Sequence, residues 1–270
     1  MNEIVDIGAN LTHDTFDDDL TEVISRAHQA GVTRLIVTGT SLDASQSALN
    51  LADRFPGRLY ATAGIHPHHA DDYDAETAAA ISDLVTHQNA VAVGECGLDY
   101  FRNYSSQKSQ LAAFESQLQI AAIVRKPVFL HQRDAHDPFV GLLREHLPEI
   151  PGGVAHCFTG TDKELEEYLS LGLHIGITGW ICDERRGQDL RQAIRNLPLD
   201  RVLLETDAPY LLPRDLSEKP RGRRNEPSLL PHILGVTARY MQQPAETVAK
   251  AATRNTERLF GLETGASGSA

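Results

Sequence analysis

The sequence predicts a single α/β domain built as a closed (β/α)8 barrel, and three observations lead to this prediction. Eight short apolar or β-branched runs recur along the 270 residues, and amphipathic stretches lie between them. Strands that alternate with helices pair in parallel through crossover connections. Eight such units in ~250 residues match the usual size of the barrel. An open doubly wound sheet is the alternative, but it normally has fewer strands, and no G-x-G-x-x-G fingerprint is present.

The predicted strands are rich in small and β-branched residues, as expected for parallel strands covered on both faces. In chain order they are IVDIG from residue 4, RLIVTG from 34, LYATAGI from 59, AVAVGE from 90, PVFLH from 127, GVAHCF from 153, LHIGIT from 173 and RVLLETD from 201.

Two of the intervening stretches show the helical period clearly. One spans residues 17–31 and ends at Gly31, a typical residue at a helix C-terminus, and the other spans residues 107–126. The apolar residues that share a face are Leu20, Val23, Ile24 and Ala27 in the first, and Leu111, Phe114, Leu118, Ala121 and Ala122 in the second. Both stretches can therefore pack one face on the barrel.

Composition is that of an ordinary globular protein, with 41% hydrophobic and 23% charged residues. We expect one domain over residues 1–262 and a disordered small-residue tail at 263–270. No apolar run approaches the ~20 residues that cross a membrane, and no signal peptide is recognisable, so no membrane partner is expected. The three separated cysteines, Cys96, Cys157 and Cys182, favour free thiols and a cytoplasmic location. We expect a monomer.

Charge is unevenly distributed along the chain. The net charge of −12 argues against a broad nucleic-acid-binding surface, which would be basic. The stretch RDLSEKPRGRRNEP, residues 214–227, is nevertheless rich in arginine. A local basic site can exist on an acidic protein.

Five predicted strands end in a residue type that ligates metals. They are His66, Glu95, His131, His156 and Asp207. Each has an ordinary structural interpretation alone: a hydrogen-bonded histidine, a paired glutamate or an aspartate that caps a turn. In a (β/α)8 barrel, however, the C-terminal strand ends meet on one rim, where the active site lies. Five candidates on one rim favour a metal site.

Imidazole nitrogens combined with carboxylate oxygens form a mixed site for a divalent cation. Such a cation activates water and polarises a phosphoryl or carbonyl oxygen. A carboxylate such as Glu95 needs a partner of this kind beside an apolar barrel, and Gly94 is expected to let the chain turn and to keep space open there. We expect surface or supporting positions for His68 and His69; for His136, packing and substrate contact both stay open.

Several motifs resemble those of the TatD family of metal-dependent deoxyribonucleases, within the wider amidohydrolase-type barrels. They are GIHPH, VGECGLDYFR, PVFLHQRDA, HCFTG and LLETDAPYL, and the resemblance runs from about residue 4 to residue 262. DIGANLT, GITGWICDERRG and APYLLPRDL are similar to bacterial members. The resemblance implies a barrel, a divalent metal, a cytoplasmic location and 3′-to-5′ exonuclease action on single-stranded DNA, with RNA as a further substrate, in DNA repair or degradation.

Matched position by position, the resemblance implies that Glu95, His131 and His156 are metal ligands and that Asp207 is the strand-eight carboxylate. Asp207 either ligates the metal or takes a proton from the attacking water. His66 lies at the edge of the site, where it touches the scissile phosphate. The catalytic candidates are thus Asp207, Glu95 and His66, and the metal candidates are Glu95, His131, His156 and Asp207.

One departure concerns the first strand. Many family members carry His-x-His there for a second metal, whereas this chain has Gly8 and Asn10. A second metal therefore lacks its usual ligands, and a site poorer in imidazole favours Mg²⁺, with Mn²⁺ as the alternative. Bacterial members share the change, so it marks a subgroup.

Substrate contacts are predicted from basic and aromatic residues near the strand ends. Arg133 follows His131 closely, and Arg223 and Arg224 lie in the basic stretch after the last strand; phosphate binding and a solvated basic turn are both open for that stretch. Asn10 is a fourth substrate-binding candidate. Stacking of bases or packing is expected of the aromatic residues Tyr100, Phe101 and Trp180.

Two other functions stay open from the sequence. One is a metal-dependent barrel hydrolase of an amide, lactone or aminoacyl ester, since metal geometry alone does not distinguish carbonyl from phosphoryl chemistry. The other is a metal-poor binding protein without catalysis, which the missing first-strand histidines would favour and the retained candidates disfavour.

Overall fold

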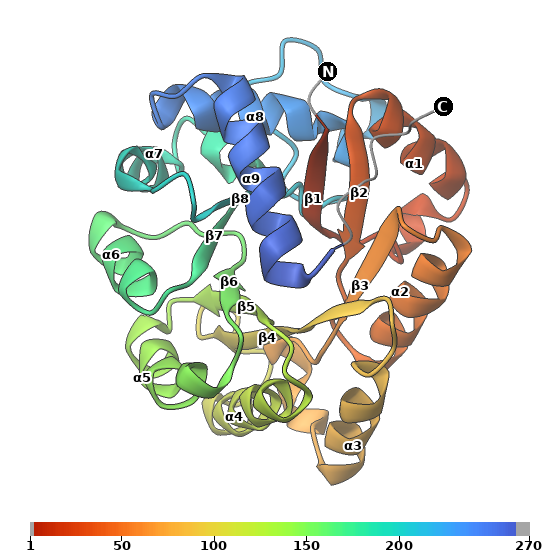
Figure 1. Ribbon diagram of the computed structural model, residues 1–270, viewed down its shortest axis with the longest axis vertical. Coiled ribbons are helices and arrows are strands. Elements are labelled where there is room, and N and C mark those ends of the chain that lie inside the picture. Colours follow the sequence, from red (N-terminus) through yellow and green to blue (C-terminus); the bar gives the residue numbers. More distant parts are fainter. Residues whose placement is uncertain (1–2, 263–270) are drawn as a thin grey trace.

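The computed structural model describes residues 3–262 and forms a nearly closed barrel of parallel strands ringed by helices (Figure 1). The strands are β1 Ile4–Ala9, β2 Val32–Val37, β3 Leu59–Ala63, β4 Ala90–Asp99, β5 Val128–Arg133, β6 Gly153–Ala155, β7 His174–Ile177 and β8 Val202–Leu204. They lie in sequence order within one sheet, and a single bridge between Ala9 and Ala208 joins its two edges. The barrel prediction is confirmed, and the doubly wound alternative is wrong.

Helices follow the strands around the outside of the barrel (Figure 1). They are α1 Leu20–Gln29, α2 Leu42–Arg54, α3 Ala75–Leu84, α4 Gln107–Val124, α5 His136–His146, α6 Asp162–Ser170, α7 Gln188–Ala193, α8 Leu230–Tyr240 and α9 Ala245–Phe260. The two helices predicted from periodicity are α1 and α4. Gly31 adopts a φ of 91° just after α1, as expected of a residue that ends a helix. No helix among residues 3–262 is long and apolar enough to cross a membrane.

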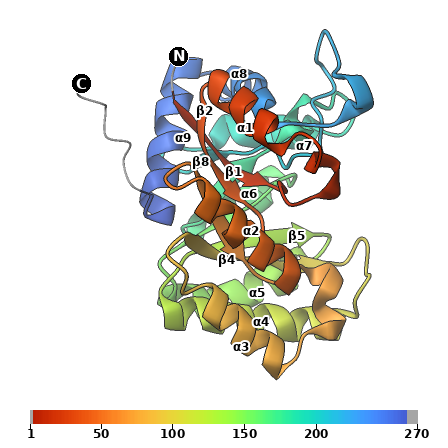
Figure 2. The same ribbon diagram turned by 90° about the vertical axis from the view of Figure 1, so that its right-hand side faces the viewer.

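Apolar side chains from β1, β2, β4, β5, β6 and β8 fill the inside of the barrel. They form a cluster separate from the layer between strands and helices, and it contains Val5, Ile7, Ile36, Val91, Ala92, Phe129, Val154, Leu203, Phe260 and Leu262. Phe260 is the last residue of α9 and Leu262 follows it; α9 lies across one end of the barrel (Figure 1). The segment between β8 and α8 projects from the other end (Figure 2). That open end carries the C-terminal ends of the strands.

Two buried glutamines of α4 hold the backbone beside the open end. Gln117 accepts a hydrogen bond from the N–H of Ile65 at 2.8 Å and donates to its carbonyl at 3.1 Å. Gln110 makes the same pair of bonds to Asp99, at 2.8 and 3.1 Å. Because these amides satisfy backbone groups where β3 and β4 leave the sheet, they fix the positions of the residues that follow.

The predicted domain limits, 1–262 and 263–270, remain a prediction. The proposed tail lies outside the described residues.

Candidate metal centre and active site

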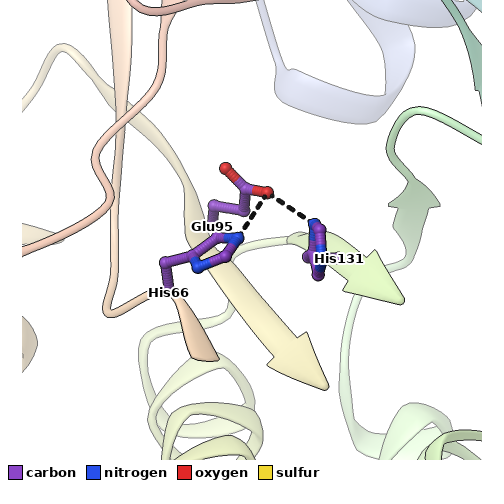
Figure 3. A group of neighbouring side chains, drawn as sticks. All are labelled: His66, Glu95 and His131. Atoms are coloured by element: carbon purple, nitrogen blue, oxygen red, sulfur yellow. Dashed lines mark ion pairs between the residues drawn. The ribbon is translucent and has the colours of Figure 1, made fainter. Parts of the chain in front are cut away.

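Glu95 is the centre of the candidate site. Its Oε1 atom lies 3.0 Å from Nδ1 of His131, 3.5 Å from Nε2 of His66 and 3.6 Å from Nε2 of His156. Figure 3 shows the first two imidazoles directed at the same carboxylate oxygen. Glu95 and His156 are buried, and one oxygen atom has three nitrogen neighbours, one from β5 and two from residues that follow β3 and β6.

The sequence predicts that the fourth strand ends at Glu95, and the structure corrects this prediction. Glu95 lies within β4, which continues to Asp99. The register of β4 against β5 shifts between Gly94 and Cys96, so Glu95 is an extra residue in a bulge. Bulges redirect a side chain without ending the strand, which explains how a buried strand presents a carboxylate to the site.

Gly94 is required by close packing. Its φ is 142°, and a Cβ atom there would lie 2.2 Å from the carbonyl oxygen of Phe129 in β5. The turn expected at this residue is absent, because β4 continues to Asp99, and the neighbour that excludes a side chain at Gly94 is the adjacent strand.

His156 is oriented by Glu205, a residue that the sequence analysis did not select. Oε2 of Glu205 lies 2.7 Å from Nδ1 of His156, and Oε1 accepts the N–H of Cys157 at 2.6 Å. Glu205 is fully buried. Burial acts to lower the pKa of His156, but Glu205 and Glu95 outweigh it and raise that pKa to about 10. A carboxylate behind a ligating histidine is a common arrangement in metal sites.

The ionisation of Glu95 follows from the same neighbours. Burial acts to raise its pKa, but the adjacent imidazoles hold that pKa well below its usual range. His66 differs from its neighbours, because burial lowers its pKa well below the ordinary value. The site therefore contains a carboxylate anion, and His66 is neutral at neutral pH.

Asp99 forms a second link between the histidines. Its Oδ2 lies 2.8 Å from Nε2 of His68 and 3.4 Å from Nε2 of His131. The sequence motif GECGLD contains Asp99, but the predicted strand ended too early to place it at the rim. The expectation that His68 supports the site agrees with this contact.

Asp207 faces the same cavity from the end of β8. Its Oδ1 accepts a hydrogen bond from the side-chain amide of Asn10 at 3.0 Å. Burial raises the pKa of Asp207 to about 7 against the opposing charge of His156. Asn10 thus orients a carboxylate and also lines the cavity, and its contact with substrate stays a prediction.

Gly8 leaves space for Glu205 where many family members have a histidine. A Cβ atom at Gly8 would lie 2.7 Å from Oε2 of Glu205 and 3.1 Å from the ring of Phe129. A side chain here would require Glu205 or Phe129 to move. A second metal bound by histidines therefore has less space here, and it also lacks its usual ligands.

Glu95, Asp207 and the histidines near them line a cavity of about 730 Å³, and its wall also includes His69, Arg133, Phe101 and Tyr210. The guanidinium of Arg133 lies 3.8 Å from the ring centre of Phe101, which is 54% exposed. Tyr210 is 51% exposed. Sequence reasoning missed Tyr210, although it stands in the LLETDAPYL motif.

The other predicted substrate residues divide into two groups. Trp180 lines the cavity, whereas Tyr100 packs against the core. Arg224 does not reach the cavity: Asp19 and Glu226 bind its guanidinium at 2.8 and 2.6 Å. The structure therefore gives Arg224 two carboxylate partners outside the cavity, and its contact with a nucleic-acid backbone stays a prediction.

Arg223 and His136 lie apart from this cavity. Arg223 is exposed and lines a neighbouring hollow. His136 begins α5, and its ring lies 5.3 Å from that of Tyr168. This contact favours the packing interpretation of His136.

The family follows from comparison with known proteins. The family model described as TatD related DNase matches residues 5–261. The chain belongs to the TatD-related DNase family. Within it, this chain is 53% identical over 259 residues to a protein of Edwardsiella piscicida named 3'-5' ssDNA/RNA exonuclease TatD, covering 96% of this chain and 100% of that protein. A protein of the same name from Pantoea sp. (strain At-9b) is 51% identical, with coverage of 95% and 99%.

Solved structures of the family have the same fold. A TatD homologue from Escherichia coli K12, YJJV, gives a TM-score of 0.87 at 31% identity, covering 96% of this chain and 98% of that one. L-Hydantoinase from Arthrobacter aurescens is more distant, with a TM-score of 0.66, 12% identity and coverage of 98% and 74%. The second likeness concerns the fold alone.

Proposed function

We propose that this protein is a divalent-metal-dependent 3′-to-5′ exonuclease that hydrolyses phosphodiester bonds at the ends of single-stranded DNA, with RNA as a further substrate. The observation that carries the proposal is the convergence of three imidazole nitrogens on one buried oxygen of Glu95 at the open end of the barrel. The proposal takes its direction and its substrates from the names of the relatives that are 53% and 51% identical.

The donor set fits a divalent cation. Ligand atoms of His66, Glu95 and His131 lie within 4.8 Å of one another, and a neighbouring group offers His156 and Asp207. We assign Glu95, His131, His156 and Asp207 as the residues that would hold it. When bound, the cation would supply an activated water and a polarised phosphoryl oxygen.

Magnesium is the proposed metal, with Mn²⁺ as the alternative. The accessible donors are carboxylate oxygens and imidazoles, which suit a cation that keeps part of its water shell. Cys157 is adjacent, but burial raises the pKa of its thiol well above the ordinary value, which disfavours the thiolate that softer metals require. The side chain of Glu205 beside Gly8 supports a single-metal site.

The chain's own residues supply the other steps. Asp207, with a pKa of about 7, can accept the proton of an attacking water near neutral pH. Asn10 holds one oxygen of Asp207, which leaves the other available to the cation or to that water. His66 is neutral and can donate an N–H to the scissile phosphate, while Arg133 can bind a neighbouring phosphate as a cation.

The proposal includes a preference for strand ends. The site lies in an open cavity at the barrel rim, and a phosphodiester reaches it only if the strand bends. Single strands bend and expose their bases easily, whereas a duplex holds its phosphates on a stiff cylinder. Phe101 and Tyr210 offer exposed ring faces beside the cavity for stacking.

We also propose a cytoplasmic monomer that acts in DNA repair or degradation. The three free cysteines support the location, since thiols persist in a reducing compartment. A carbonyl hydrolase is disfavoured because the barrels with that chemistry share only the fold, and a non-catalytic binding protein is disfavoured by the assembled site.

The test is a metal titration with labelled single strands. Protein freed of metal by a chelator is supplied with Mg²⁺, Mn²⁺, Ca²⁺ or Zn²⁺, and 5′-labelled, 3′-labelled and circular DNA strands are followed over time. We expect activity to return with Mg²⁺ or Mn²⁺, 5′-labelled strands to shorten stepwise, and circles to stay intact. Full activity without metal would exclude the metal mechanism, and rapid cutting of circles would exclude the exonuclease.

Variants make the same test specific to the site. His131→Ala should reduce turnover strongly while the barrel stays folded, because it removes one ligand of the site. His28→Ala, an exposed histidine of α1, serves as the control and should leave turnover unchanged. Equal turnover in both variants would show that His131 is structural.

A further inference from the structure

A second hollow lies beside the catalytic cavity and is unexplained by the proposed chemistry. It measures about 670 Å³ and lies between the short 3-10 helix Gly179–Cys182, the residues that follow it, and the segment 211–223. Trp180, Arg186 and Leu211 line both hollows, so the two spaces are adjacent on the same rim. We call the second hollow the basic pocket.

The basic pocket is positively charged on an acidic protein. Among the side chains that the structure describes, five cations line it together with the carboxylates of Asp183 and Glu184; the cations are Arg185, Arg186, Arg214, Lys219 and Arg223. The whole chain carries a net charge of −12. A local excess of three positive charges, concentrated in a hollow, attracts an anion from solution.

Asp183 organises these cations and does not repel an anion as a free carboxylate would. It is buried, and its Oδ2 lies 2.8 Å from Nε of Arg186 and 3.1 Å from Nε of Arg214. Its Oδ1 accepts the backbone N–H groups of Arg185 and Arg186. Burial acts to raise the pKa of Asp183, but these bonds lower it to about 2, so the carboxylate stays ionised and paired.

The remaining cations have unused donors. Among residues 3–262, no carboxylate pairs with the side chain of Arg185, Lys219 or Arg223, and Arg185 and Arg223 are exposed. Arg186 stacks on Trp180, with its Cζ atom 4.3 Å from the ring centre. The pocket thus combines a fixed arginine on an aromatic ring with free guanidinium groups, a combination that suits nucleic-acid backbones.

We propose that the basic pocket binds the phosphates of a single-stranded nucleic acid on the 5′ side of the bond cleaved in the adjacent cavity. This inference rests on the proposed function, because the strand must place its 3′ end at Glu95. Trp180, Arg186 and Leu211 line both hollows, and the proposed course of the strand runs over these three residues from one hollow to the other. The pocket therefore makes long strands better substrates than very short ones.

The experiment compares strand lengths in the double variant Arg185→Ala with Arg223→Ala. Binding of a labelled single-stranded 20-mer and of a trinucleotide, both with phosphorothioate linkages to slow cleavage, is measured by fluorescence anisotropy with Mg²⁺ over a range of salt. Arg58→Ala, an exposed arginine in the loop after α2 that precedes β3, is the matched control. Cleavage of an unmodified 20-mer by the wild type is measured separately.

We expect the double variant to lose on the order of tenfold in the ratio of its affinities for the 20-mer and the trinucleotide. Its plot of log affinity against log salt should be shallower by about 1.4, since each phosphate contact to a single strand contributes about 0.7. Arg58→Ala should match the wild type on both counts.

Any one of three results of the binding measurements would overturn the inference. They are an unchanged length ratio and salt slope, equal losses for both lengths, and no binding of the 20-mer by the wild type. A free mononucleotide can compete for the pocket as the product of the reaction would. If it displaces the 20-mer more strongly from the wild type than from the double variant, the pocket binds the product, and the inference is also overturned. Absence of cleavage by the wild type, with the binding results as expected, would count against the proposed function alone.

Discussion

At the scale of single residues, the site depends on carboxylates that hold other side chains in place. Glu205 bonds to His156, and Asp99 bonds to His68 and lies 3.4 Å from Nε2 of His131. A carboxylate that accepts a hydrogen bond from one ring nitrogen of a histidine keeps the proton on that nitrogen and fixes the orientation of the ring. The other ring nitrogen, without a proton, then faces the metal position. Glu205 leaves Nε2 of His156 directed at Glu95.

Glu205→Gln should weaken metal binding about 10- to 100-fold. The amide can still accept the N–H of Cys157, but its NH2 group then faces Nδ1 of His156 and shifts the imidazole proton to Nε2. Calorimetric titration with Mn²⁺ measures the effect without an activity assay. Asp53→Asn is the control, since that exposed carboxylate pairs with His87 at 3.4 Å away from the cavity. Equal affinities in both variants would refute the orienting role.

At the scale of elements, the sequence predicted which strands form but not how two of them end. The residue types of β4 extend without interruption through VGECGLD, so apolar patterning could not reveal a bulge at Glu95. The placement of Gln117 was equally hidden, because a glutamine in an amphipathic helix is normally exposed, whereas this one is buried against the end of β3. Tertiary contacts determine both the bulge at Glu95 and the burial of Gln117, and the periodicity of the local sequence does not reveal such contacts.

Gln117→Leu should destabilise the protein by roughly 2–4 kcal/mol, because the N–H and carbonyl of Ile65 lose their partners in a buried place. It should also lower turnover, since Ile65 precedes His66. Denaturant unfolding measures the first effect and the nuclease assay the second. Gln119→Leu on the exposed side of α4 should change stability by no more than about 0.5 kcal/mol. A stable, fully active Gln117→Leu protein would contradict this account of α4.

At the scale of the whole molecule, the barrel separates stability from chemistry. The interior cluster and the end of α9 fill one end, and the ionisable groups gather at the other. Five strand-end residues were predicted to converge from positions as distant as His66 and Asp207, and topology alone made that prediction possible. The family resemblance extended it to chemistry. Topology did not predict the ion pairs of Arg224. They depend on the packing of α1 against a loop that lies more than a hundred residues away in the sequence.

The seam between β1 and β8 contains a buried carboxyl group that makes barrel stability depend on pH. Asp6 is fully buried and accepts the backbone N–H groups of Gly8 and Thr206 at 3.2 and 3.0 Å. The hydroxyl of Thr206 also bonds to it. Burial raises the pKa of Asp6 to about 7, against the opposing effect of these bonds.

The raised pKa sets the direction of the effect. Below the unfolded pKa of 3.8 both states hold the proton, and between there and about 7 the folded state keeps a proton that the unfolded state releases. Within this window, the free energy of unfolding should therefore fall by about 1 kcal/mol for each pH unit. Asp6→Asn removes the titration and keeps acceptors for the N–H groups, so its stability relative to the wild type should rise from pH 5 to pH 7 and then level off. Urea unfolding at half-unit pH steps measures the difference, with the exposed Glu145→Gln as the control. A constant difference across the window would show that Asp6 is already ionised in the folded barrel.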